Sequence, residues 1–503
     1  MSRKFTLKTG IKAVAFLVVF ALLFHLATEV LRSKWTGDNQ DRYVMQNFYD
    51  LDEDSLDVLF LGSSQIIYGV NPVEMYDHAG VSAYCLGGAS ASLLSSYYWL
   101  IEAEKTQSPT VVMLETSSLL EEIKEYQERK KVDEMRPSLN RVRFVQALTD
   151  LDNISESFLS YLIPMVKYHV RWSSLTAKDF GMWMNSDVAY RGFNIADTCK
   201  QGLNYDQMII DNDDPEEDVR ELYDYQLEYL DKIVTYCREN DIELVLFKTP
   251  KYSWTGSDSA QVQALADQYG LTYLDYNWEE ALTAFGFDLE IDMKDYDHLS
   301  LSGADKFSDY LADYLTASYD LPDRREDETF DLQINRDTYN QEHTDADLVS
   351  ATDAVEWLTL LTQHSTCDVF IATNGDVGGQ VSDEIAALLA QLGLETDLNA
   401  LASGDGFVAL LTSDGVSGTS VEEVTAAEKA QISGTLSNGV RYNIVSRNQG
   451  ETVSAELTIN GTDTSLNGAG LNIRVYSESR WTAIETVCID LETGEMTCKT
   501  RPD

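Results

Sequence analysis

Basic residues are scarce in this chain relative to acidic ones. Its 503 residues include 37 Lys and Arg but 84 Asp and Glu, which gives a formal net charge of −47 at pH 7. The phosphates of nucleic acids require a cationic surface, so this balance argues against nucleic acid as a partner. It also argues against a folded part that lies flat on anionic lipid. The composition instead predicts an acidic, soluble surface.

Cysteine pairs with redox or metal spacing are also missing. The six cysteines form no CxxC pair, and no group of Cys and His has the spacing of a zinc site. We therefore predict no metal centre. Cys488 and Cys498 flank a turn-like segment at 492–495, so they are compatible either with a disulfide across a hairpin or with two free thiols.

Long apolar runs are limited to one, near the N-terminus. Residues 11–31 are about as long as the ~20 residues that a bilayer-spanning helix needs. Basic residues in segment 1–10 place that end in the cytoplasm, because positive charge is retained there. No Ala-x-Ala-like cleavage site follows closely, which favours an uncleaved anchor over a signal peptide. We thus expect a single-pass membrane protein whose remaining chain is extracellular.

Residues 51–320 alternate between short apolar segments and amphipathic ones. Such alternation is typical of an α/β domain in which helices cover both faces of a parallel sheet. The expected strands are 57–61, 81–86, 110–114, 242–247 and 271–275, and the expected helices include 92–105, 217–239 and 260–269. In such a sheet the reactive groups lie at the carboxyl ends of the strands.

A turn of small residues, Gly62-Ser63-Ser64, follows the first of these strands. A strand that ends in this way raises a hydroxyl at the edge of the sheet, but a serine becomes a nucleophile only beside a base. Asp295 and His298 are three residues apart, just ahead of a helix whose start is suggested by the capping-box spacing of Ser302 and Asp305. We predict that Ser64 is the nucleophile, His298 its base and Asp295 the carboxylate that orients the base.

The oxyanion formed by such chemistry needs hydrogen-bond donors that are already in place. The backbone amides of Ser64 and Gly87 suit this role, and the hydroxyl of Ser117 would add a side-chain donor. An insertion at 121–212 adds no further catalytic pattern.

Two basic side chains of this insertion, His169 and Arg171, have two interpretations. They either reach the site and bind a substrate anion or sugar, or they belong to a structural cap.

With these residues the chain resembles the SGNH/GDSL hydrolase superfamily over roughly residues 51–320. Segment 62–64 matches the first sequence block with Ser64 as nucleophile, Gly87 matches the second-block glycine, and Asp295 with His298 matches the last block. The resemblance implies a flavodoxin-like, three-layer fold and acyl transfer through an acyl-serine.

Within that superfamily the chain is most similar to the membrane-anchored, extracytoplasmic branch. This branch includes D-alanyl-lipoteichoic acid biosynthesis proteins and alginate-type O-acetylation proteins, which work beside membrane-bound O-acyltransferases. Ser63 stands where many relatives have aspartate, as it does in this branch. The third-block asparagine is missing, and segment 115–118 occupies its place, which leaves transfer, hydrolysis and reduced activity open.

Residues 321–350 are polar and charged without sustained periodicity, so we expect a linker there. Residues 351–503 form a second, smaller α+β domain, with no arrangement of nucleophile, histidine or paired carboxylates. The stretches 369–372, 388–394 and 470–476 resemble interleukin-like EMT inducer (ILEI) domains. This resemblance implies a non-catalytic accessory module, which would be a glycan binder, a spacer or a partner-docking domain.

Together these observations predict an extracytoplasmic, membrane-anchored serine acyl-ester hydrolase or O-acyltransferase. Its substrate would be an acylated cell-surface polysaccharide or wall polymer, its partner a membrane-bound O-acyltransferase, and no cofactor is implied. The alternative is a non-catalytic surface protein that binds glycan and docks on such an acyltransferase.

Overall fold

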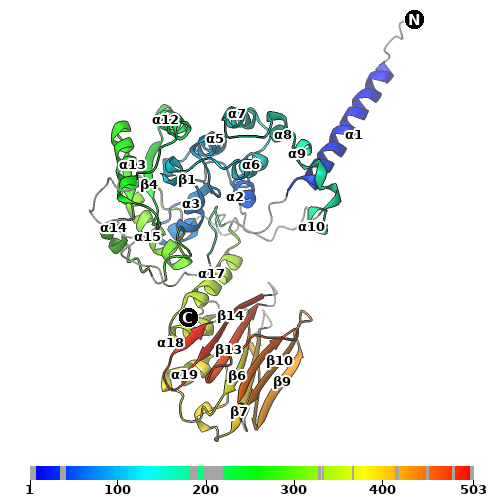
Figure 1. Cartoon of the computed structure of the whole chain (residues 1–503), viewed down its shortest axis with the longest axis vertical. Helices are drawn as coiled ribbons and strands as arrows, with labels where there is room; N and C mark the ends of the chain where they lie inside the picture. Colours follow the sequence, from blue (N-terminus) through cyan, green and yellow to red (C-terminus); the bar gives the residue numbers. More distant parts are fainter. Residues whose placement is uncertain are drawn as a thin grey trace.

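The computed structural model describes most of the chain as two folded units and one projecting helix (Figure 1). The described residues are 7–33, 41–180, 190–196, 219–289, 291–326, 330, 334–364, 367–413, 419–448, 453–477 and 482–498.

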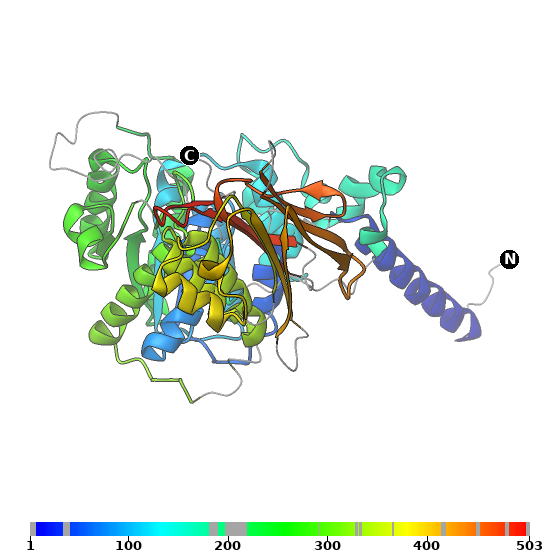
Figure 2. The same ribbon diagram turned by 90° about the horizontal axis from the view of Figure 1, so that it is seen from below.

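Helix α1 (Leu7–Leu31) extends away from the rest of the molecule in both views (Figures 1 and 2). Its segment Gly10–Leu31 is long and apolar enough to cross a membrane. The side chains from Ile11 to Ala27 are exposed, and Thr28 is the first to be buried by the folded body. The predicted apolar helix is therefore confirmed.

The first folded unit is built on a five-stranded, entirely parallel sheet in the order β2-β1-β3-β4-β5. The strands are β1 (Val58–Gly62), β2 (Ala83–Gly87), β3 (Val111–Glu115), β4 (Glu243–Lys248) and β5 (Thr272–Asp275). Strands β1, β2 and β3 are buried throughout, because helices cover both faces of the sheet. The predicted parallel sheet is thus confirmed, with the strand order of flavodoxin-like folds.

Helices flank this sheet on two sides, with α5 and α12 above the strands and α3 and α15 below them in Figure 1. The flanking and neighbouring helices are α2 (Asp41–Phe48), α3 (Ser64–Gly69), α4 (Pro72–Ala79), α5 (Leu93–Ala103), η1 (Ser117–Leu120), α12 (Asp224–Glu239), α13 (Gly256–Tyr269), α14 (Glu279–Ala284) and α15 (Leu301–Ser318).

Several helix starts differ from their predictions, and α13 begins at Gly256 rather than at residue 260. Helix α12 begins at Asp224 rather than at residue 217; residues 217 and 218 lie outside the described residues, and 219–223 are not helical. The N-cap of α15 is Ser300, whose side chain accepts a hydrogen bond from the amide of Gly303. The capping-box prediction at Ser302 was therefore wrong, because Ser302 donates its hydroxyl to Asp292 instead.

The insertion is helical over much of its described part, whereas residues 190–196 form a turn closed by a bridge between Tyr190 and Phe193. The helices of the insertion are α6 (Glu125–Glu134), α7 (Leu139–Thr149), α8 (Phe158–Leu162), α9 (Pro164–Tyr168), η2 (His169–Ser173) and α10 (Ala177–Phe180). Helices α9, η2 and α10 contact α1, and both views show this part of the insertion at the base of α1.

The segment expected as a linker contains a helix and specific side-chain contacts where it is described. Helix α17 (Arg336–Ser350) occupies its second half, and Arg324 pairs with Asp57 through two hydrogen bonds of 2.7 Å. Tyr339 of α17 is buried in the core of the first unit, whereas Leu348 is buried in the core of the second. The polar sequence folds as a helix because tertiary contacts on both sides stabilise it.

The second unit has three layers, with helices on one face of a larger sheet and a smaller sheet on the other. The helices are α18 (Ala354–Gln363), α19 (Asp383–Gln391) and η3 (Leu398–Ala400). The six-stranded antiparallel sheet has the order β15-β14-β13-β6-β7-β8, and the four-stranded one β12-β11-β10-β9. One apolar core lies between the helices and the larger sheet, and another lies between the two sheets. These helices and sheets give the unit the mixed α and β content expected of it.

The strands of the second unit make up its two antiparallel sheets. Their bounds are β6 (Asp368–Asn374), β7 (Asp405–Ser413), β8 (Thr419–Ala427), β9 (Lys429–Thr435), β10 (Arg441–Arg447), β11 (Ser454–Ile459), β12 (Thr462–Asp463), β13 (Gly470–Ser477), β14 (Thr482–Ile489) and β15 (Met496–Cys498). Cys498 lies opposite Val487 rather than opposite Cys488, both side chains are buried, and no disulfide joins them. The structure thus favours the alternative without a disulfide.

Candidate active site

The turn after β1 presents Ser64 at the carboxyl edge of the parallel sheet. Gly62 is required there, since a Cβ at this position would lie 2.7 Å from the Cβ of Glu115 on the neighbouring strand. The hydroxyl of Ser63 caps α3 by accepting a hydrogen bond from the amide of Gln65. In the sheet, β2 lies on one side of β1 and β3 on the other, so the order of the strands changes direction at β1. Open α/β sheets form their sites at such a switch point.

Ser64, His298 and Asp295 form a continuous chain of hydrogen bonds, although 234 positions separate the serine from the histidine. Ser64 Oγ is 2.8 Å from His298 Nε2. On the other side of the ring, His298 Nδ1 is 2.9 Å and 3.0 Å from the two oxygens of Asp295. A carboxylate beside Nδ1 keeps the proton on that nitrogen, so Nε2 offers its lone pair to the serine hydroxyl.

Asp295 is held in its ionised form. Burial alone would raise its pKa, but the hydrogen bond and charge of His298, the amide of Asp297 and the charge of Lys294 outweigh burial and lower the pKa to about 2. Asp295 Oδ1 also accepts hydrogen bonds from the backbone amides of Asp297 and His298, at 2.8 Å and 3.0 Å. The tight turn from 295 to 298 therefore fixes the carboxylate against the imidazole.

A fully buried ion pair lies beneath this arrangement, at the ends of β3 and β4. Lys248 Nζ is 3.0 Å from Glu115 Oε1, and neither side chain is exposed. Glu115 also accepts hydrogen bonds from the hydroxyls of Ser63 and Ser117. Burial lowers the pKa of Lys248, and the charge of Glu115 opposes this shift. Paired and hydrogen-bonded in this way, the two charges avoid much of the cost of burial.

Gln65 joins this ion pair to the loop that carries His298. Its Oε1 accepts hydrogen bonds from Lys248 Nζ at 2.9 Å and from the hydroxyl of Thr249 at 2.7 Å. Two donors on Oε1 fix the orientation of the side-chain amide, and its Nε2 donates to the carbonyl of Asp297. The residue after Ser64 therefore clamps the residue before His298.

Aromatic and cationic side chains cover the outer side of the imidazole. The ring of Tyr68 makes an edge-on contact with His298 at a centroid distance of 5.0 Å. Lys294 Nζ lies 3.7 Å from the centroid of the Tyr68 ring, and Asn194 donates a hydrogen bond to the Tyr68 hydroxyl. Ser64 itself is half-buried, and the His298 side chain is 19% exposed, so the pair is sheltered yet accessible from solvent.

The predicted oxyanion donors have different surroundings. Gly87 lies opposite Gly62 in the sheet, and a Cβ on Gly87 would lie 2.7 Å from Ile66, so glycine allows α3 to approach β2. Ser117, in contrast, donates both its amide and its hydroxyl to Glu115 Oε1. Because its donors are occupied inside the protein, the assignment of Ser117 to the oxyanion hole is withdrawn.

The two basic residues of the insertion do not join the site. His169 is exposed and its Nδ1 is 3.0 Å from the carbonyl of Val166. Arg171 Nη1 donates to the backbone carbonyls of Leu31 and Arg32, both at 2.7 Å, at the C-terminal end of α1. The substrate-binding interpretation is therefore replaced by the structural one, since Arg171 satisfies carbonyls that a helix end leaves unpaired.

Comparison with models of known protein families and with curated protein sequences finds no match for this chain. Its functional interpretation therefore depends on the residues and their geometry.

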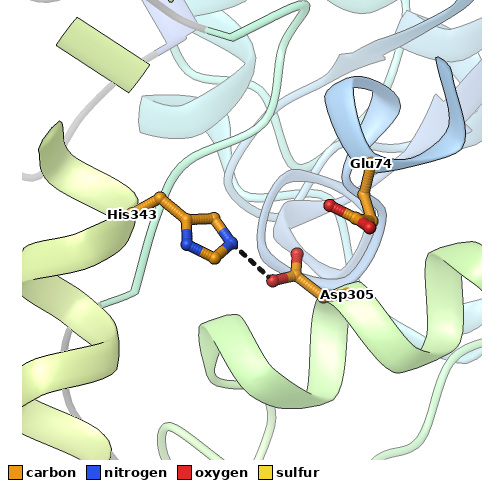
Figure 3. A group of neighbouring side chains, drawn as sticks. All are labelled: Glu74, Asp305 and His343. Atoms are coloured by element: carbon orange, nitrogen blue, oxygen red, sulfur yellow. Dashed lines mark hydrogen bonds and ion pairs between the residues drawn. The ribbon is translucent and has the colours of Figure 1, made fainter. Parts of the chain in front are cut away.

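A second cluster of titratable side chains lies where α4, α15 and α17 meet (Figure 3). Ligand atoms of Glu74, Asp305 and His343 lie within 4.8 Å of one another, which is close enough to surround a metal ion. However, His343 Nε2 is 2.8 Å from Asp305 and its Nδ1 is 3.0 Å from Asp347. Burial disfavours the imidazolium, but these two carboxylates raise the pKa of His343 to about 10. A protonated histidine has no lone pair for a metal. At neutral pH the cluster is therefore a set of ion pairs that connects α17 to α15.

Sequence reasoning missed the supporting residues Gln65, Lys248 and Tyr68. A signal for Lys248 was present, because it directly follows an apolar strand and so lies at the carboxyl edge of the sheet. No comparable signal marked Gln65 or Tyr68, whose partners come from segments more than 120 positions away.

Proposed function

We propose that this protein is a serine acyl-ester enzyme with Ser64 as nucleophile, His298 as general base and acid, and Asp295 as the residue that orients His298. The observation that supports this most strongly is the uninterrupted hydrogen-bond sequence from Ser64 Oγ through the imidazole to the Asp295 carboxylate. An arrangement of this kind at the switch point of a parallel sheet, together with the resemblance at 62–64, 87 and 295–298, favours the SGNH/GDSL type of chemistry.

In the first half of the reaction, Ser64 Oγ attacks the ester carbonyl carbon while His298 Nε2 takes the hydroxyl proton. The tetrahedral oxyanion would be held by the amides of Ser64 and Gly87. When the intermediate collapses, the bond to the alcohol oxygen breaks and His298 returns the proton to that oxygen, which leaves an acyl-serine. Asp295 stabilises the imidazolium in both steps and remains ionised.

In the second half, a hydroxyl attacks the acyl-serine with His298 again acting as base. Water as the attacking group gives hydrolysis, and a sugar hydroxyl gives O-acyl transfer. The apolar helix α1, preceded by basic residues in the sequence, supports anchoring in a membrane with the folded units on the outer side. We therefore propose an acylated cell-surface polysaccharide or wall polymer as the substrate.

A fluorophosphonate probe tests the nucleophile directly. The wild-type chain should be labelled covalently, whereas Ser64→Ala should not be labelled and Ser63→Ala should retain labelling. Ser63 is the matched control, because it is the adjacent serine and its hydroxyl faces Glu115. An unlabelled wild-type protein that is folded by circular dichroism would refute the enzymatic proposal and favour a non-catalytic surface protein.

Hydrolysis and transfer are separated by the fate of the acyl group. A labelled acetyl ester is supplied with and without an oligosaccharide acceptor, and the products are followed by mass spectrometry. Acetate as the sole product supports a hydrolase, and an acetylated oligosaccharide that requires Ser64 supports a transferase.

A further inference from the structure

Between residues 159 and 180 of the insertion, six large apolar side chains are exposed to solvent, and we call them the apolar ridge. They are Leu159 (58% exposed), Ile163 (37%), Val166 (46%), Val170 (61%), Trp172 (73%) and Phe180 (53%). Leu159 lies on α8, Val166 on α9 and Val170 on η2, and Ile163 is the non-helical residue between α8 and α9. A surface helix of a soluble domain normally turns its polar side chains outward, so the exposed apolar side chains along this path of three short helices depart from that rule.

The opposite face of the same path is fixed against the body of the protein. Tyr161 and Tyr168 are buried, and the guanidinium of Arg129 lies over both rings, at 4.7 Å and 5.1 Å from their centroids. The Tyr168 hydroxyl donates to Asp133 at 2.6 Å. These contacts hold the tyrosines inward, so the apolar ridge cannot turn away from solvent without breaking them.

The apolar ridge lies where α1 meets the body of the protein. Arg171, between Val170 and Trp172, donates hydrogen bonds to the carbonyls of Leu31 and Arg32, and α9, η2 and α10 all contact α1 (Figures 1 and 2). Helix α1 is exposed up to Ala27 and becomes buried at Thr28. The apolar ridge therefore lies beside the part of α1 where its side chains change from exposed to buried.

The charge of this stretch differs from that of the rest of the chain. No Asp or Glu occurs between Glu156 and Asp179, although the whole chain has 84 of them, and Lys167, Arg171 and Lys178 lie in the interval. Segments that lie in the membrane interface combine apolar side chains and Trp with Lys and Arg. Lys167 and Arg171 pair with Glu156 and Asp179 at the two ends of this interval, so the overall charge of −47, which argues against adsorption of the whole body on anionic lipid, is not carried by this stretch.

We propose that the apolar ridge inserts into the interfacial region of the same bilayer that α1 spans, in the leaflet at the C-terminal end of α1. This inference rests on the membrane anchoring given under the proposed function. Two attachments, a span and a ridge, would fix the orientation of the body on the membrane. Helix α6 of the insertion extends this support toward the site, because Lys131 Nζ donates to the carbonyl of Ala89 in the loop after β2.

Lipid-dependent quenching of a fluorophore tests the proposal on the full chain. The chain is placed in nanodiscs of phosphatidylcholine and phosphatidylglycerol, with an NBD label on Val170→Cys or on the matched control Val453→Cys, an exposed valine of the second unit. The five described cysteines are buried, and Cys199, which lies outside the described residues, is replaced by Ser in both variants. Brominated phosphatidylcholine should quench the label at 170 about twofold or more and leave the label at 453 unchanged.

A second variant shows whether the apolar ridge itself causes the quenching. Ile163→Asp with Val166→Asp should reduce quenching at 170, while the melting temperature stays close to that of the parent because both side chains are already exposed. Unquenched label at 170 in a chain that resists extraction by carbonate would overturn the proposal and leave the anchoring intact. The proposal would also be overturned if brominated lipid did not quench the label at 170 and position 170 crosslinked to a membrane protein in native membranes. A chain that washes off in carbonate refutes the anchoring and this inference together, whereas labelling of Ser64 by fluorophosphonate is independent of all three outcomes.

Discussion

At the scale of single residues, the role of Asp295 depends on its charge. Its pKa is lowered to about 2, so the carboxylate is ionised at any pH where the protein is expected to work. Because this pKa lies below the ordinary value of 3.8, the residue stabilises the fold above about pH 4. That contribution is lost as the pH falls from about 4 to about 2.

Replacing Asp295 by Asn should keep the shape of the turn but allow the wrong tautomer of His298. We expect kcat/KM for an activated ester to fall by about 10³ to 10⁴, as in other triads that lose this charge. Ester hydrolysis at neutral pH measures the effect, with the melting temperature as the check on folding. A loss smaller than tenfold would show that Asp295 does not orient the base.

Gln65 should act through the position of His298 rather than on the substrate. Gln65→Glu keeps the size of the side chain and its acceptor for Lys248, but it removes the donor to the carbonyl of Asp297. We expect labelling by fluorophosphonate to slow by about tenfold to a hundredfold, since small displacements of a catalytic group have large effects on rate.

The matched comparison for this prediction is Thr249→Val, which removes the other donor to Gln65 Oε1 but retains the clamp. Its labelling rate should remain within a few-fold of wild type. Equal rates for Gln65→Glu and the wild type, with equal KM for an ester substrate, would contradict a positioning role.

Lys248 and Glu115 form a pair in which each charge depends on the other. Lys248→Met leaves a buried carboxylate without its cation, and we expect the free energy of unfolding to fall by about 3–5 kcal/mol. Adding Glu115→Gln removes the orphaned charge and preserves an acceptor for Ser63 and Ser117, so the double variant should recover most of that loss. Urea unfolding of the four proteins gives the coupling, and additive effects would contradict it.

At the scale of elements, α17 is attached to the first unit by ion pairs on polar side chains. His343 bridges Asp305 and Asp347, and Arg336 pairs with Asp77. The pKa of His343 is raised to about 10 from an ordinary 6.5, so its stabilising effect is complete below about pH 6.5 and is lost as the pH rises through 10. The pKa of Glu74, raised to about 7 by burial and by Asp305, adds a loss of stability with rising pH between about 4.5 and 7.

His343→Gln should therefore remove the alkaline part of this dependence. We expect the variant to be less stable than wild type by about 1–3 kcal/mol at pH 6.5 and nearly equal to it at pH 10.5. Thermal unfolding at pH 6.5, 8.5 and 10.5 measures the difference. A gap that stays constant over this range would show that the imidazolium is not what joins the helices.

Elements with strong periodicity could be predicted from the sequence, and those stabilised by distant partners could not. The five strands of the parallel sheet were recognised because apolar runs of five or six residues end in turns. The same reasoning placed Ser64 at the carboxyl edge of the sheet, whereas His298 was paired with it because of its spacing from Asp295 ahead of a helix and the resemblance to the last SGNH/GDSL block. Helix α17 was missed because its stability comes from contacts with α15, α18 and β14 rather than from its own apolar pattern. Two interpretations of Arg171 stayed open because the carbonyls that it binds lie 139 and 140 positions away in the sequence.

At the scale of the whole molecule, the boundary between the two units lies inside α17 rather than in a flexible linker. Ile334, Tyr339 and Ala346 are buried in the first core, and the next turn of the helix contributes Leu348 and Val349 to the second. Two adjacent turns of one rigid helix thus belong to different cores. The helix therefore restricts rotation of the backbone between the two cores.

A pair of truncations tests where the first unit ends. A chain that stops after Ser350 keeps the buried residues of α17, so Ser64 should still be labelled by fluorophosphonate. A chain that stops after Glu326 loses the apolar contacts of Ile334, Tyr339 and Ala346, which are worth several kcal/mol in total at about 25 cal/mol per Å². We expect its melting temperature to be lower by about 10 °C and its labelling to be reduced at 37 °C. If the two truncated chains melt together, α17 is a passive connector and the first unit already ends before it; if they differ as expected, the helix belongs to the first unit although its sequence is that of a linker.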